Sequence, residues 1–215
     1  MFDFISRYIS AVSLAAVTAL SLFNVGYFWK IGLHFVGLVD LTNLVYSAGL
    51  AIVPIFLGIL AAGFASPRRP KLWKIIILGI IGGALILWGT SRFGPRSHEP
   101  ELMENGAILL GMVISLSAFL TWTLDRYRQT NQWDWRDTAV LLLISFGTAF
   151  QAGMLMVSLE LSDRITYTVT TKSDLLEHAR LLRSSSTGFI LAVNGSVMFV
   201  PLAEVKTIKS DVGSK

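Results

Sequence analysis

The sequence predicts an α-helical polytopic membrane protein with four to five transmembrane helices, followed by a small C-terminal β-rich domain. Of its 215 residues, 53% are hydrophobic and only 15% are charged, whereas soluble domains carry roughly 25% charged residues. Long stretches contain no charged side chain, and the C-terminal part instead alternates between apolar and polar residues. A chain with so little polar surface is neither an ordinary soluble domain nor a disordered one.

Five segments are apolar enough for transmembrane helices, which need about 20 mostly apolar residues. They are residues 8–29, 41–67, 75–91, 105–124 and 138–159, and none contains Asp, Glu, Lys, Arg or His. The first segment is dotted with Ser, Thr and Asn, so it is either a span with a polar stripe or a helix lying in the interface. We expect it to span the membrane. The prediction is therefore five spans, with four as the alternative.

Small residues recur four positions apart in the spans, a spacing that lets helix backbones approach closely. The pairs are Gly58 and Ala62, Gly79 and Gly83, and Ala149 and Gly153. They are candidates for packing in a homo-oligomer, and packing inside one subunit is the alternative. The amides Asn24 and Gln151 lie well inside spans. They line a pore or, as we expect, lock two helices by a hydrogen bond.

The distribution of lysine and arginine indicates the orientation, because cytoplasmic loops carry an excess of them. One side holds Arg7, Arg68, Arg69, Lys71, Lys74, Arg126, Arg128 and Arg136, and the other side holds Lys30, Arg92 and Arg96. Five spans then place the N-terminus in the cytoplasm and the C-terminal domain outside. Four spans bring both termini into the cytoplasm, so the side of the C-terminal domain stays open.

We divide the chain into a transmembrane helical domain, residues 1–160, and a β-rich domain, residues 161–215. Residues 165–171 alternate between apolar side chains and threonine, which predicts a half-buried strand. Ser173 and Asp174 then suit the first turn of a helix. This predicted short helix carries Leu175, Leu176, Ala179 and Leu182.

A hairpin is predicted next, because Asn194-Gly195 separates the apolar runs 189–193 and 196–200. Residues 201–204 predict one helical turn, and residues 205–208 a last short strand. This order resembles the end of an SH3-like small barrel. A unit of about 50 residues is marginal alone. We therefore expect it to pack on the membrane part, on symmetry mates or on a partner.

Residues that carry catalysis or bind metals do not cluster in the sequence. The chain has no cysteine, which excludes disulfides and thiolate sites. Its histidines, His34, His98 and His178, lie far apart, and no phosphate loop or dinucleotide motif occurs. The uncharged spans also lack the groups that proton relays and coupled transporters generally need. We predict a protein that is not an enzyme and binds no cofactor and no metal.

Residues 125–137 form the most unusual loop, in which arginines alternate with aromatic residues. Such aromatic side chains sit at headgroup depth, and arginines bind lipid phosphates or acidic protein surfaces. The candidates for partner or lipid binding are Arg68, Arg69, Lys71, Lys74, Arg126, Arg128, Trp133, Trp135 and Arg136. Simple interfacial anchoring is the alternative. Direct nucleic-acid binding is not expected so close to a bilayer.

The layout of a small multi-span protein with a short tail resembles the membrane subunit of Kiwa-type bacterial anti-phage defence systems. The resemblance implies a homo-oligomer of the bacterial inner membrane that senses phage-induced membrane perturbation and recruits a soluble DNA-binding effector. Five spans with an external tail depart from the implied cytoplasmic docking, which would then use residues 66–74 and 125–137. We expect a non-enzymatic sensor and scaffold with a soluble protein partner. A small pore-forming or transport subunit is the alternative.

Overall fold

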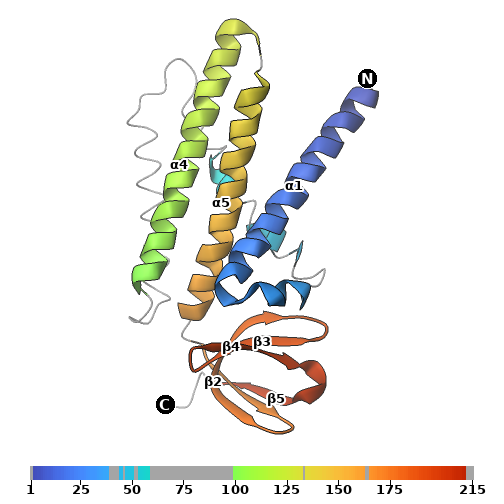
Figure 1. Ribbon diagram of the computed structural model, residues 1–215, viewed down its shortest axis with the longest axis vertical. Coiled ribbons are helices and arrows are strands. Elements are labelled where there is room, and N and C mark those ends of the chain that lie inside the picture. Colours follow the sequence, from blue (N-terminus) through green and yellow to red (C-terminus); the bar gives the residue numbers. More distant parts are fainter. Residues whose placement is uncertain are drawn as a thin grey trace.

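In the part of the chain that the structure describes, three long helices form a bundle, and a β domain lies at one end of it (Figure 1). The computed structural model describes residues 2–38, 44–45, 47–50, 53–58, 99–132, 134–162 and 165–211. The helices are α1 (Phe2–Ile31), α4 (Glu99–Thr130) and α5 (Trp135–Ser162). Each is long and apolar enough to cross a membrane. The helices predicted at residues 8–29, 105–124 and 138–159 are therefore confirmed, whereas the segment 75–91 lies outside the described residues.

Helix α5 lies between α1 and α4 and packs against both (Figure 1). The crossing of α1 and α5 is close because glycine stands at the contact on both helices. A Cβ atom on Gly26 would lie 2.1 Å from the carbonyl oxygen of Phe150, and one on Gly153 would lie 2.0 Å from that of Phe23. Any larger residue at these two positions must push the helices apart.

The β domain is a five-stranded antiparallel sheet with the strand order β4-β3-β2-β1-β5. Its strands are β1 (Tyr167–Thr171), β2 (Leu175–Ser184), β3 (Gly188–Val193), β4 (Ser196–Pro201) and β5 (Val205–Ser210). The predicted hairpin is confirmed, with Asn194 at φ 50° and Gly195 at φ 80° in its turn. The predicted helical turn is the 3-10 helix η2 (Leu202–Glu204), and the first and last predicted strands are also present.

The short helix predicted after Ser173 is wrong, because this segment is the strand β2. Two β-bulges explain the error, since each inserts one extra residue between paired positions. The first lies opposite β1, where Val169 pairs with Leu176 but Tyr167 pairs with Ala179, and the second lies between Leu181 and Arg183. The bulges increase the distance between successive buried or half-buried apolar residues from two positions to three, as between Leu176, Ala179 and Leu182. A spacing of three is typical of a helix.

The hairpin of β3 and β4 is apolar on both faces because both faces are covered. Phe189, Leu191 and Val193 of β3 belong to a core inside the β domain, to which all five strands contribute. Ile190 and Ala192, on the opposite face, pack against a second core that includes residues of α1 and α5. Of the three supports expected for this small domain, the structure therefore shows packing on the helical bundle.

Candidate functional site

Three polar side chains join the helices to the β domain at its buried edge. Tyr27 comes from α1, Glu160 from the last turn of α5 and Arg183 from β2. The Nη1 atom of Arg183 lies 3.6 Å from Oε1 of Glu160, and the Tyr27 hydroxyl donates a hydrogen bond to the same carboxylate. The Arg183 guanidinium also lies 4.1 Å from the centroid of the Tyr27 ring. We call these three residues the junction cluster.

The junction cluster is almost fully withdrawn from solvent, since Tyr27 is 0% and Arg183 is 8% exposed. A buried ion pair contributes little net stability, but removing one partner leaves an uncompensated buried charge. Arg180 adds a second contact, because its guanidinium donates to the carbonyl oxygen of Leu161 at the end of α5. Movement of the β domain away from α5 must break both contacts.

A second polar network connects all three helices near the same end of the bundle. Lys30 of α1 forms an ion pair with Glu101 of α4, and its Nζ atom lies 3.1 Å from the Ser158 hydroxyl of α5. Asn105 donates to the same hydroxyl at 3.1 Å and accepts a hydrogen bond from Gln151 at 2.9 Å. Gln151 therefore makes the hydrogen bond between helices that the sequence predicts.

Described parts of the second predicted span also contact this bundle. The Ser47 hydroxyl donates to Oδ1 of Asn24 at 3.1 Å. The Ser117 hydroxyl of α4 donates to the carbonyl oxygen of Gly58 at 3.0 Å. A Cβ atom on Gly58 would lie 2.9 Å from the Leu116 side chain, so this glycine packs closely on α4.

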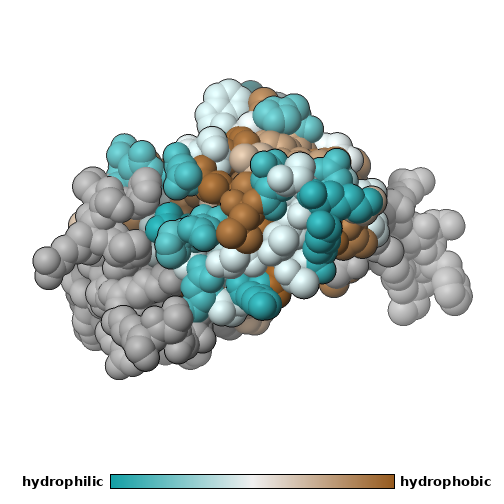
Figure 2. Space-filling view, turned by 90° about the horizontal axis from the view of Figure 1, so that it is seen from below, coloured by the Kyte–Doolittle hydropathy of each residue, from teal (hydrophilic) through white to brown (hydrophobic). Residues whose placement is uncertain are grey.

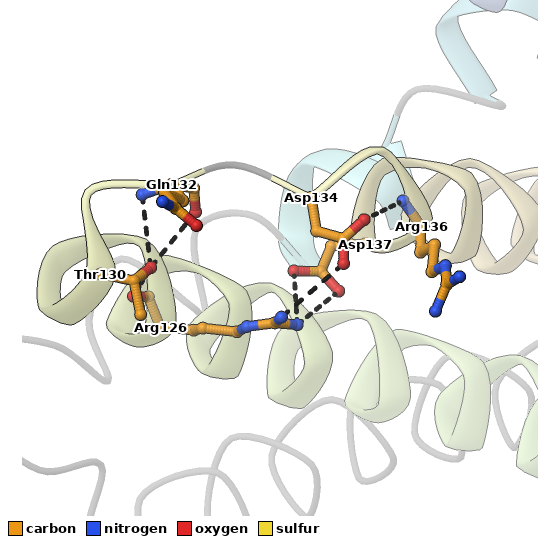
Figure 3. Close-up of polar contacts among 6 residues, drawn as sticks. All are labelled: Arg126, Thr130, Gln132, Asp134, Arg136 and Asp137. Carbon is orange, nitrogen blue, oxygen red and sulfur yellow. Dashed lines mark hydrogen bonds and ion pairs between the residues drawn. The ribbon is translucent and has the colours of Figure 1, made fainter.

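At the opposite end, Arg126 fastens the turn between α4 and α5 (Figure 3). Its Nη1 atom lies 3.3 Å from both carboxylate oxygens of Asp137, and its Nη2 atom lies 3.7 Å from Asp134. Asp134 also accepts a hydrogen bond from the backbone N–H of Arg136 at 3.0 Å and so satisfies a free donor at the start of α5. Asp137 is 7% exposed. Arg126 therefore has a structural role in the hairpin.

Other candidate binding residues of the hairpin lie at its surface. Arg128 and Arg136 are exposed, and the Arg136 guanidinium lies 5.9 Å from the centroid of the Trp135 ring. Trp135 is 73% exposed, and Trp122 and Tyr127 are also exposed. This arrangement suits an aromatic belt with arginines at headgroup depth.

The structure describes only some of the remaining residues that the sequence analysis singled out for binding or packing. Arg68, Arg69, Lys71, Lys74, Trp133, Ala62, Gly79 and Gly83 lie outside the described residues. Ala149 is fully buried, and Gly153 packs on Phe23 and Tyr27 of the same chain. The described small residues thus have contacts inside the subunit, and their role in an oligomer stays a prediction.

Hydrogen bonds in the β domain lower the pKa of one acidic residue, Asp211. Asp211 follows β5 and accepts hydrogen bonds from Thr168 at 2.7 Å and from Thr166 at 2.8 Å. Nδ1 of His178, which lies in the first bulge of β2, is 3.6 Å from Asp211. The bonds from Thr168 and Thr166, with His178 contributing less, hold the pKa of Asp211 below its ordinary value.

The junction cluster was not among the residues singled out in the sequence, because its members are far apart along the chain. Glu160, just beyond the fifth apolar segment, and Arg183, directly after the apolar pair Leu181-Leu182, were the available signals. Among the described residues, no group of three His, Cys, Asp or Glu is placed to hold a metal ion. The chain matches no known protein family, no characterised protein and no solved structure.

Proposed function

We propose that this protein is a non-enzymatic, oligomeric sensor and scaffold of the bacterial inner membrane that recruits a soluble effector. The proposal rests on the ion pairs that hold both ends of α5. Its first turn is paired with α4 through Asp137, and its last turn is paired with the β domain through Glu160. A displacement of α5 within the bilayer is therefore transmitted both to the α4–α5 turn and to the β domain. Anti-phage defence is the setting that the Kiwa resemblance implies.

The course of the chain favours five spans over four. Helices α1 and α5 run toward the β domain, and α4 runs away from it (Figure 1). The ion pair of Lys30 and Glu101 keeps the end of α1 beside the start of α4. If each of the three helices crosses once, the segment between them crosses an even number of times. The predicted spans 41–67 and 75–91 supply two such crossings.

With five spans, the excess of basic residues places the α4–α5 hairpin in the cytoplasm and the β domain outside. The docking surface for a soluble effector then includes Arg128 and Arg136, together with the predicted loop 66–74. The β domain, whose strand order and η2 turn support an SH3-like barrel, is the external part of the sensor. Because Arg126 also pairs with Asp137, its replacement would disturb the hairpin, and the docking test therefore uses Arg128 and Arg136.

A small pore-forming or transport subunit is the second candidate function. The polar network from Lys30 to Gln151 favours it, because it brings polar groups into the bundle interior. These side chains hydrogen-bond one another, however, which is the pattern of helices held together. Ion flux through purified protein in liposomes distinguishes the two functions.

The recruitment test compares two charge reversals of equal size at opposite ends of the molecule. We expect native mass spectrometry of the tagged protein, purified from its membranes in mild detergent, to show a homo-oligomer with a soluble partner. Arg128→Glu with Arg136→Glu should lose the partner, because the docking charge is reversed. Lys206→Glu with Lys209→Glu, at exposed positions of β5, is the matched control and should retain it. A partner that is lost only in the β5 variant would place docking on the β domain and overturn the assignment.

A further inference from the structure

A short 3-10 helix, η1 (Leu33–Leu38), turns the chain sideways where α1 ends (Figure 1). Gly32 makes the turn with φ at 123°, a backbone angle that favours glycine at the end of a helix. Its N–H donates to the carbonyl oxygen of Phe28 at 2.8 Å, and its own carbonyl accepts from Phe35 at 3.1 Å. The chain therefore leaves α1 in a fixed direction.

The helix η1 is apolar on two sides that meet different surroundings. A 3-10 helix has three residues per turn, so residues three apart share a face. Phe35 and Leu38 share one face and pack in the core between the helices and the β domain, where Phe35 is 5% exposed. Leu33 and Val36 share another face and are 48% and 37% exposed. The outward face is therefore apolar and partly exposed.

The depth of η1 along the bundle follows from its packing partners. Phe35 belongs to the same core as Val157, one turn before Glu160 on α5. Asp137 and Glu160 are separated by about 35 Å at 1.5 Å per helical residue, close to the roughly 30 Å of a hydrocarbon core. If Asp137 lies at one headgroup layer, η1 lies near the other. Trp29, one turn before η1, is 62% exposed, as aromatic belt residues are.

We propose that Trp29, Leu33 and Val36 form an in-plane contact with the acyl–headgroup boundary and seat the β domain on the membrane surface. The bilayer is the occupant because η1 directly follows α1, a helix apolar enough to cross the membrane. The η1 helix carries no charged residue. Figure 2 shows the molecule from below, at the end of the β domain that points away from the helices. Hydrophilic residues surround an apolar patch on this face. The inference rests on membrane insertion alone and is independent of effector recruitment.

The absence of cysteine allows single-site labelling of the full chain. Leu33→Cys and Val36→Cys place the label on the proposed lipid face. Leu175→Cys and Leu202→Cys are matched controls, because these leucines are also about half exposed but lie in the β domain. Each variant carries an environment-sensitive fluorophore and is reconstituted in phosphatidylcholine vesicles with or without lipids that bear a quencher near the headgroup.

We expect labels at positions 33 and 36 to emit at shorter wavelength than the controls and to lose emission with the quencher lipids. Labels at positions 175 and 202 should emit as in water and keep their emission. Equal behaviour at all four positions would overturn the proposal. A blue shift at 33 and 36 without lipid quenching, combined with self-quenching between labels, would assign the face to a second copy of the chain and would also overturn it.

Discussion

Asp137 and Glu160 occupy opposite ends of α5, and each is paired with an arginine of another element. Arg126 of α4 lies 3.3 Å from Asp137, and Arg183 of β2 lies 3.6 Å from Glu160. Both carboxylates are largely buried, but only the Glu160 pair has a buried arginine as well, so that pair is the more costly one to break from one side. Helix α5 is thus paired with α4 at one end and with the β domain at the other, so it connects these two parts of the molecule.

Removal of the Glu160 carboxylate should loosen the β domain. Glu160→Ala leaves the buried Arg183 charge without this partner, which costs about 3–5 kcal/mol. Thermal unfolding in detergent and the rate of proteolysis between Ser162 and Tyr167 measure the effect. Glu104→Ala, which removes an exposed glutamate from α4, is the control and should change neither.

The double variant Glu160→Leu with Arg183→Leu separates charge burial from packing. Replacing a whole buried ion pair by apolar residues is often neutral or stabilising, so the double variant should recover much of the lost stability. A double variant that is less stable than Glu160→Ala would show that the pair itself, and not an isolated charge, holds the junction.

The α1–α5 crossing should not tolerate a methyl group. Gly153→Ala places a Cβ atom against the backbone of Phe23 and Tyr27, and overpacking of this kind costs about 1–3 kcal/mol. Gly111→Ala on α4 is the matched control, since nothing lies within 4 Å of a Cβ atom there. Thermal unfolding of the two variants in the same detergent should separate them clearly. Equal stabilities would mean that the helices adjust without cost.

The sequence predicts the type of nearly every described element, because hydrophobic periodicity and turn residues act locally. The long helices, the Asn194-Gly195 hairpin and the last strand were all predicted in this way. Strand β2 was not, because two bulges change the spacing of its apolar residues. The junction cluster was also missed. Tyr27, Glu160 and Arg183 meet only when the β domain folds back on the bundle, and no local pattern encodes that contact.

The lowered pKa of Asp211 predicts an acid-sensitive β domain. A group whose pKa is lower in the folded state stabilises the fold fully above its unfolded pKa, and this contribution is lost as the pH falls through the folded value. Unfolding of the full chain, followed by circular dichroism, should therefore show falling stability below about pH 4. Asp211→Asn should flatten this part of the profile. Thr168→Val should flatten it in part, because loss of the largest cause of the shift brings the folded pKa of Asp211 closer to its unfolded value.

Replacement of Arg126 should lower the stability of the protein more than replacement of Arg136. Arg126→Ala removes the partner of the buried Asp137 and should destabilise the protein by about 1 kcal/mol, a value reduced by the partial exposure of the Arg126 side chain. Arg136→Ala removes a guanidinium that stacks on the exposed Trp135 ring and should leave stability almost unchanged. The two variants have the same charge, so a difference in thermal unfolding reports the contacts of Arg126 with Asp137, Asp134 and the Trp122 ring. Equal losses would show that Arg136 also holds the hairpin, and its use as a docking residue would then need the reversal of Arg128 by itself.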